Sequence, residues 1–309
     1  MRFRKVVLMY HSVSGPNWPA AVGSFPIPLS RFQHQVRAAR AAGWHFGRLS
    51  ELRAPVAANT LYVTGDDGTA DWARNVLPWC EAEGVPTHTA LITGPWQSPP
   101  LYPVAHRLQI LLALPGRQLP QPDLTPEQQA YIDRVYAYET DPRRRALKGA
   151  CNVVLDDAAA RDLLGPPASD EAALLAARFA DPTEYRGWHL AEFGAHTVSH
   201  RAFDGQSEQY YAEEIAPCAA AIQSRGLLVS GYFTLPMRPR FPATVEQLVP
   251  VLRARGYAGV LDGQGEWDGA SFIVPRIDAK NVETHLGLPP APPDETHESA
   301  CLAGHEVSR

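Results

Sequence analysis

Short apolar runs in the first part of the chain alternate with stretches whose apolar residues recur at helical spacing. The runs that predict buried β-strands lie at residues 5–10, 60–63 and 87–92. The stretches that predict helices lie at 30–43, with Ser30 in the N-cap position, and at 71–83, just before Gly84. Because strands that alternate with helices form parallel βα units, this order predicts an α/β fold, either a (β/α) barrel or a doubly wound sheet.

The alternation of strand patterns with helix patterns stops after residue 92. Residues from 95 to about 165 contain many prolines and helical patterns at 104–114 and 126–138, but no strand pattern. We expect a helical insertion of about 95–165 at the mouth of the fold, where βα loops carry function. Its aromatic and basic residues, among them Trp96 and His106, could shape a substrate pocket. The alternative is that these helices are exposed to solvent and have no part in binding. The sequence pattern does not favour either interpretation.

The alternation resumes in the last part of the chain. We expect helices at 170–179, 207–225 and 243–254, and strands at 190–195, 228–235, 257–261 and 271–277. Beyond Pro289 apolar residues are few, which is typical of a flexible tail. The predicted organisation is therefore one domain, residues 1–288, that includes the insertion, followed by a tail at 289–309.

Composition and charge limit the kinds of molecule that the protein is expected to bind. The 309 residues are 45% hydrophobic, which is enough for a sizeable core. With 28 basic and 33 acidic residues the net charge is −5, and no dense basic patch occurs, so we expect no nucleic-acid partner. The first apolar run, at 6–10, is too short for a signal-peptide core or a membrane span. We therefore expect a cytoplasmic protein.

The four cysteines do not suggest a disulfide framework. They are widely spaced and form no Cys-x-x-Cys pair: Cys80, Cys151, Cys218 and Cys301. We expect reduced thiols, mostly buried, and not a disulfide frame or a zinc knuckle.

Two adjacent carboxylates, Asp66 and Asp67, follow the predicted strand at 60–63. Neighbouring like charges at a strand end are costly unless a cation compensates them, and a bound metal ion would do so. One carboxylate could then ligate the ion while the other accepts a proton from bound water. The alternative is an ordinary turn in which Asp67 caps a helix.

Two histidines, His196 and His200, follow the predicted strand at 190–195. At a spacing of four residues they would share one side of a helical turn and converge on one ion, although a helix surface with two ordinary histidines has the same spacing. Together with Asp67 they form a set of two histidines and one carboxylate. Such a set leaves metal positions open for water and substrate, as a catalytic site requires.

These motifs resemble those of the polysaccharide deacetylases, the NodB-homology carbohydrate esterases. Thr-Gly-Asp-Asp-Gly at 64–68 matches the Asp-Asp-Gly motif of the family, and residues 196–200 match its His-Ser/Thr-x-x-His motif. Segments at 7–13, 232–236 and 274–278 resemble the opening and the C-terminal strands of the family, so the similarity spans about residues 5–280. The resemblance implies a NodB-type distorted (β/α) barrel with a helical insertion.

The resemblance also implies roles for the motif residues. Asp67, His196 and His200 match the family's ligands of a divalent metal, which we expect to be Zn²⁺. Asp66 matches the general base, which would take a proton from the attacking water while the metal polarises an amide carbonyl.

The chain departs from the family pattern around the expected substrate. The family's oxyanion-binding N–H follows a proline, here near Met237, but Leu-Pro-Met-Arg replaces the usual Tyr-Pro-Tyr-Gly. The backbone role can survive this change. Arg238 is an added cation that could bind a carboxylate or phosphate of the substrate, or it is a surface arginine. Gly65 replaces an aromatic residue, which predicts open space beside the base.

The general acid must be a different histidine from the one that the family uses. Many members use a Leu-x-His motif on a late strand, where this chain has Ile-Val-Pro-Arg at 273–276. We expect His11 to act instead, because it ends the first strand, which neighbours the last strand in a closed barrel; a core histidine is the alternative. We place Arg276, with Met237 and Arg238, among the substrate-contacting residues, and expect it to pair with Asp66 and keep it ionised.

The expected function is that of a metal-dependent hydrolase. It would remove an N-acyl group, which we expect to be acetyl, from an amino sugar or glycan-related substrate. One alternative is a catalytically inactive NodB-like protein that binds carbohydrate. Another is a deformylase or amidase that acts on a non-polymeric substrate with the same residues.

Overall fold

The sheet of this protein is a parallel barrel that is almost closed. The computed structural model describes residues 3–15, 23 and 25–292. Its strands follow the order β7-β6-β5-β1-β10-β9-β8, all parallel, with the short β4 (His45–Phe46) beside β5. Their bounds are β1 Lys5–Tyr10, β5 Thr60–Gly65, β6 Thr87–Leu91, β7 Ala191–Ala195, β8 Tyr232–Thr234, β9 Gly259–Gln264 and β10 Ile273–Asp278.

Only a short contact closes the gap between the edge strands β7 and β8. The N–H of Phe193 donates to the carbonyl of Leu228 at 2.7 Å, and the N–H of Ser230 donates to the carbonyl of Phe193 at 2.9 Å. The strand expected at 228–235 is therefore only three residues long, because its first half makes this bridge and does not join the ladder. The expected distorted (β/α) barrel is confirmed.

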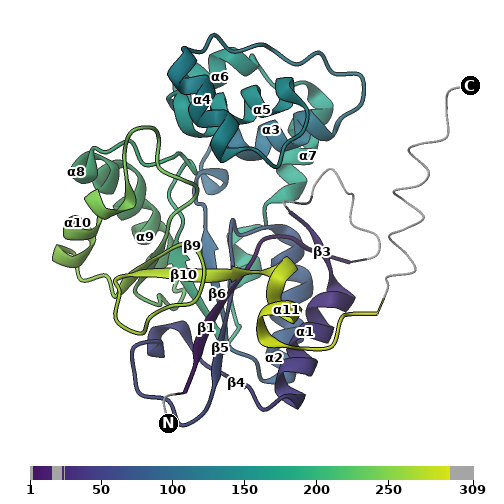
Figure 1. Ribbon diagram of the computed structural model, residues 1–309, viewed down its shortest axis with the longest axis vertical. Coiled ribbons are helices and arrows are strands. Elements are labelled where there is room, and N and C mark those ends of the chain that lie inside the picture. The colour runs from purple at the N-terminus through teal and green to yellow at the C-terminus, as the bar shows by residue number, and fades with distance from the viewer. Residues whose placement is uncertain (1–2, 16–22, 24, 293–309) are drawn as a thin grey trace, which may run out of the picture.

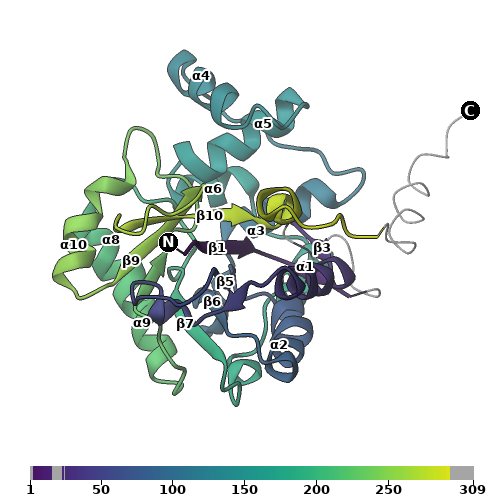
Figure 2. The ribbon, with the colours of Figure 1, turned by 60° about the horizontal axis from the view of Figure 1, so that its bottom comes forward.

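Helices cover the outside of the barrel (Figures 1 and 2). They are α1 Leu29–Ala41, α2 Leu77–Glu83, α8 Ser207–Tyr210, α9 Ala216–Gln223, α10 Val249–Ala254 and α11 Val282–Leu286. A π-helical turn at Tyr211–Ile215 joins α8 to α9, so the expected long helix is confirmed. Ser30 is not the N-cap of α1: the helix begins one residue earlier, after Pro28, because the strand β3 (Ile27–Pro28) runs directly into it.

The alternation of side chains along the strands separates two layers. Val7, Tyr62 and Val274 pack inside the barrel in one apolar cluster, whereas Val63 joins the larger cluster between strands and helices. Because side chains alternate with period two, Asp66 faces the same way as Tyr62, into the barrel. The apolar filling ends below it, so the carboxyl ends of the strands carry the polar residues.

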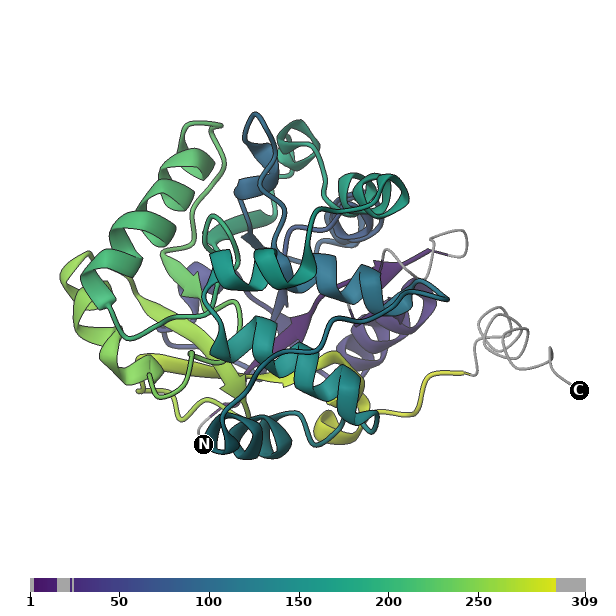
Figure 3. The same cartoon turned by 90° about the horizontal axis from the view of Figure 1, so that it is seen from above.

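Five helices between β6 and β7 lie across this end of the barrel (Figures 1 and 3). They are α3 Val104–Ala113, α4 Pro126–Val135, α5 Pro142–Gly149, α6 Asp157–Leu164 and α7 Ser169–Arg178. Leu108, Leu147 and Cys151 form part of their own apolar cluster, and α3 packs against α7. The helical segment thus runs on to Arg178, and its treatment as an insertion within one domain stays a prediction.

Three of the expected thiols are confirmed. Cys80, Cys151 and Cys218 are buried and free. Cys301 and the tail expected at 289–309 lie outside the described residues from residue 293 onward. Within the described ranges, no helix has the length and apolar character needed to cross a bilayer.

Candidate metal centre

The carboxylate pair lies at the point where β5 leaves the sheet. The N–H of Asp66 still bonds to the carbonyl of Tyr10, at 2.9 Å, and Asp67 then turns away with φ +75°. A left-handed conformation at a residue other than glycine costs about 1–3 kcal/mol, and it persists at functional sites. Asp67 caps no helix; Asp71 does so, accepting from the N–H of Trp72. The helix-cap part of the alternative is therefore wrong, although Asp67 and Gly68 do lie in a turn.

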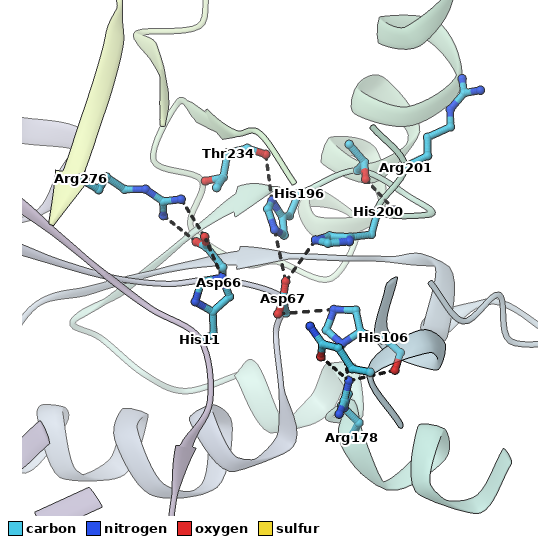
Figure 4. A network of polar contacts seen from close by, with 12 residues as sticks. His11, Asp66, Asp67, His106, Arg178, His196, His200, Arg201, Thr234 and Arg276 are labelled. Atoms are coloured by element: carbon cyan, nitrogen blue, oxygen red, sulfur yellow. Dashed lines mark hydrogen bonds and ion pairs between the residues drawn. The ribbon is translucent and has the colours of Figure 1, made fainter. Parts of the chain in front are cut away.

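Arg276 binds Asp66 through both carboxylate oxygens, each at 2.7 Å, as Figure 4 shows. Its guanidinium also donates to the Thr64 hydroxyl at 3.2 Å. Burial alone would raise the pKa of Asp66, but Arg276, with His196 and His11, lowers it below its ordinary value. The expected pairing is confirmed, and it keeps a buried carboxylate ionised.

The loop that carries the two histidines is not helical, contrary to the expected turn. Thr197 and His200 have φ values of +71° and +62°, so the chain after β7 curls in the left-handed region. The carboxylate of Glu214 accepts from the N–H groups of Val198 and Ser199 at 3.0 and 2.9 Å. These bonds replace the intrahelical ones and fix the loop in a shape that still points both histidines to one side.

Both histidines face the same oxygen of Asp67 (Figure 4). Nε2 of His196 lies 3.4 Å and Nε2 of His200 lies 3.3 Å from Oδ1 of Asp67. Ligand atoms held at about 2.1 Å by a tetrahedral zinc ion lie about 3.4 Å from one another. The distance from Asp67 to each of the two histidines therefore matches the spacing that a metal ion imposes.

The partner of the His196 ring fits a metal ligand, and within the described part of the chain the ring of His200 has no hydrogen bond that would compete with a metal ion. Nδ1 of His196 donates to the carbonyl of Thr234 at 2.9 Å, which leaves the lone pair on Nε2, the arrangement of metal-ligating histidines. His200 is buried, and neither of its ring nitrogens has a hydrogen-bond partner among the described residues. Burial lowers the pKa of His200, and the histidines around Asp67 bring its pKa well below the ordinary value in spite of burial.

A third histidine, His106, enters the site from α3. Its side chain is 1% exposed, and its Nε2 lies 3.4 Å from Oδ2, the other oxygen of Asp67. One donor atom each from Asp67, His106 and His200 lie within 4.8 Å of one another. The sequence placed His106 only among residues that could shape a substrate pocket, and its helical context offered no signal that it would reach the carboxylate.

His11 lies beside the base, as expected from the neighbouring first and last strands. Its Nε2 is 4.0 Å from Oδ2 of Asp66, and its ring packs against that of Phe25. The side chain is 23% exposed, so it can meet both the base and a molecule at the mouth. The structure places His11 where a proton donor could act, and the role itself stays a prediction.

The expected substrate contacts lie after β8. Met237 is half-buried and lines a small pocket together with His200 and Asp157, whereas Arg238 is exposed. Arg276 is buried against Asp66 and is 3% exposed. Contact of these three residues with a substrate stays a prediction.

Gly65 does not open space beside the base. A Cβ at this position would meet the ring of Trp72 at 2.4 Å. Because Gly65 alternates with Asp66 along β5, it faces the outer layer, and Trp72 fills that layer with 0% exposure. The expected gap is wrong: an aromatic ring is present, supplied by a later residue.

Solved structures share this fold. The chain matches IcaB from Ammonifex degensii at 17% identity, over 92% of this chain and 96% of that one, with a TM-score of 0.51. It matches the Streptococcus pyogenes deacetylase PplD, solved in complex with acetate, at 12% identity, over 95% and 100% of the two chains, with a TM-score of 0.52. No family model and no curated protein matches the sequence. The fold expected from the resemblance to polysaccharide deacetylases is confirmed.

Proposed function

We propose that this chain, on the fold it shares with deacetylases, is a metal-dependent hydrolase that removes an N-acyl group from an amino sugar or glycan-related substrate. The observation that carries the proposal is the different environment of two adjacent buried carboxylates. Asp66 is held ionised by Arg276, while Oδ1 of Asp67 faces nitrogens of His196 and His200. One carboxylate is thus prepared to accept a proton and the other to hold a cation.

Asp67, His196 and His200 would hold the divalent metal, for which Zn²⁺ suits the nitrogen and carboxylate donors. When bound, such an ion supplies a Lewis acid for the acyl carbonyl and lowers the pKa of water. The rest of the chemistry falls to side chains of this chain. Asp66 would accept the proton of the attacking water, because Arg276 keeps it ionised.

Proton return and charge stabilisation would come from two other elements. His11, 4.0 Å from Asp66, would give a proton to the leaving amine. A backbone N–H near Met237, in the loop after β8, would donate to the oxyanion that forms at the acyl carbon. Both groups lie at the same end of the barrel as Asp67, and the helices α3–α7 lie across that end (Figure 3).

Acetyl is the acyl group to test first, because PplD was solved with acetate, the product that hydrolysis of an N-acetyl group would release. The test incubates the Zn²⁺-loaded protein with N-acetyl and N-formyl amino sugars and short oligosaccharides, and measures the acid released. We expect release by the wild type and a loss of about 10²–10⁴-fold in kcat for Asp66→Asn, with metal retained. Asp133→Asn, the same change at a residue that is 49% exposed, is the control and should be unaffected.

The panel also separates the alternatives. Release of formate only would favour a deformylase, and release from non-sugar amides only would favour an amidase. Metal binding without any release would favour a carbohydrate-binding protein. Full activity of Asp66→Asn would show that Asp66 is not the base.

A further inference from the structure

The helical segment between β6 and β7 contributes a side chain to the proposed metal centre. His106, on the first turn of α3, faces Oδ2 of Asp67, whereas His196 and His200 face Oδ1. A nitrogen at 3.4 Å from a carboxylate could be a metal ligand or could donate to the carboxylate. The two roles require opposite states of Nε2: a lone pair for a ligand, a proton for a donor.

The neighbour of Nδ1 decides between these roles. Nη1 of Arg178, on α7, lies 3.2 Å from Nδ1 of His106 with hydrogen-bond geometry. The same Nη1 donates to the carbonyl of His106 at 3.1 Å and to the side-chain oxygen of Gln109 at 2.9 Å. The two protons of Nη1 are shared among these three acceptors, and because a guanidinium has only donors, Nδ1 of His106 takes part with its lone pair. In the neutral ring the one proton is then on Nε2, which faces Asp67.

The neutral state of the ring follows from its surroundings. His106 is 1% exposed and lies beside the cation of Arg178. A second ring proton, on Nδ1, would point at that cation, so the ring does not carry both protons.

His196 shows the opposite arrangement. Its Nδ1 donates to a backbone carbonyl, and its Nε2 keeps the lone pair that a ligand needs. Ligating histidines almost always donate their other N–H to an acceptor. At His106 a cation occupies that place. We propose that His106 is a positioning residue that donates from Nε2–H to Oδ2 of Asp67, so that Oδ1 is turned to the metal held with His196 and His200. This inference rests on the proposed metal site.

A buried ion pair and a buried arginine anchor this histidine to the helical segment. Next to it, Nε of Arg107 donates to Glu171 of α7 at 2.6 Å, with both side chains less than a tenth exposed. Arg178, at the end of α7, is 0% exposed. The pairing of α3 with α7 therefore fixes the ring of His106 over Asp67. The helical segment thus lies across the end of the barrel and also contributes a residue to the metal centre.

The test compares metal affinity in variants of the full chain. His106→Leu removes the donor, whereas His106→Gln places an amide N–H₂ near the position of Nε2. His45→Gln is the control at an exposed histidine. With Co²⁺ as the probe, we expect His106→Leu to bind about 10–100-fold more weakly and His106→Gln to stay within a few-fold of the wild type. If His106→Leu fails to fold, His106→Asn, whose amide is too short to reach Asp67, replaces it.

The visible absorption of bound Co²⁺ reports which atoms ligate it. At saturating Co²⁺, the proposal predicts the wild-type spectrum for the His106 variants and an altered one for His200→Gln. Unchanged affinity in His106→Leu and His106→Asn would overturn the positioning role. A spectrum altered as in His200→Gln would overturn it in favour of ligation. Failure of the wild type to bind any metal would contradict the proposed site itself, an outcome that differs from both.

Discussion

Arg276 binds both oxygens of Asp66, although the two residues stand 210 positions apart in the sequence. The pairing arises because β5 and β10 both lie beside β1, so the side chains that they point into the barrel meet above the apolar filling. A buried carboxylate without this cation would lose its charge or its position. The pair therefore gives the proposed base both its ionisation and its orientation.

Replacing Arg276 with methionine should reduce activity without emptying the metal site. We expect kcat to fall on the order of 10²-fold, because Asp66 loses the two bonds that orient it. Metal content should stay at the wild-type value, since Asp67 and the histidines do not touch Arg276. Acid release and metal content are measured on the same preparation. Loss of metal together with activity would show that Arg276 supports the whole site and not the base alone.

Glu214 should affect the metal through the loop that it holds. Its carboxylate accepts from the N–H groups of Val198 and Ser199 and from the Ser199 hydroxyl, at 2.8–3.0 Å. Glu214→Gln turns one acceptor into a donor facing those groups. We therefore expect the affinity for Zn²⁺ to fall about 10–100-fold, measured by competition with a chelator. Glu213→Gln, at the neighbouring residue that is 49% exposed, is the matched control and should leave affinity unchanged.

Glu283 should make stability depend on pH outside the site. Arg31 donates to both of its oxygens, at 2.8 and 3.0 Å, and buried Gln35 donates at 2.9 Å. Burial would raise the pKa of Glu283, but the bond from Arg31 and the further contacts bring it below 4.5. A lowered folded-state pKa contributes stability that is present above about pH 4.5 and is lost as the pH falls through the folded value.

Glu283→Gln should therefore reduce the free energy of unfolding by about 1–2 kcal/mol at pH 7. The difference from the wild type should shrink as the pH falls below 4.5 and through the lowered pKa of Glu283, because the carboxyl of the folded wild type then becomes protonated. Urea unfolding at several pH values measures both. Glu246→Gln, at an exposed residue, is the control. A difference that is equal at pH 7 and pH 3.5 would contradict the ionic origin of this stabilisation.

The parallel strands and the position of the carboxylate pair could be predicted because their signals are local, whereas closure of the strands into a barrel was implied by the resemblance to a known family. An apolar run predicts a buried strand, and period two then tells which side of the strand end Asp66 faces. The pairing of Arg276 with Asp66 was expected from charge alone, because a nearby cation keeps a carboxylate ionised. These inferences use spacing along one strand or the charges of two side chains.

His106 could not be found in this way. A histidine on a helix of mixed composition has the same spacing whether it faces solvent or a carboxylate, and the docking of α3 over Asp67 depends on contacts with α7. The non-helical shape of the loop at 196–200 could not be predicted for a related reason. Its shape is set by Glu214, a residue of a later helix, so the spacing of four alone suggested a helical turn. The filled space beside Gly65 could not be predicted either, because a later residue, Trp72, supplies the ring that the family has at this position.

In the proposed metal centre, Asp67, His196 and His200 hold a divalent metal next to an ionised base. The most direct measurement is the metal content of the purified protein, after Zn²⁺ is offered and excess removed, for the wild type beside His196→Ala. We predict about one equivalent of metal in the wild type and little or none in the variant. No metal in the wild type, or an equal amount in both proteins, would contradict the proposed metal centre.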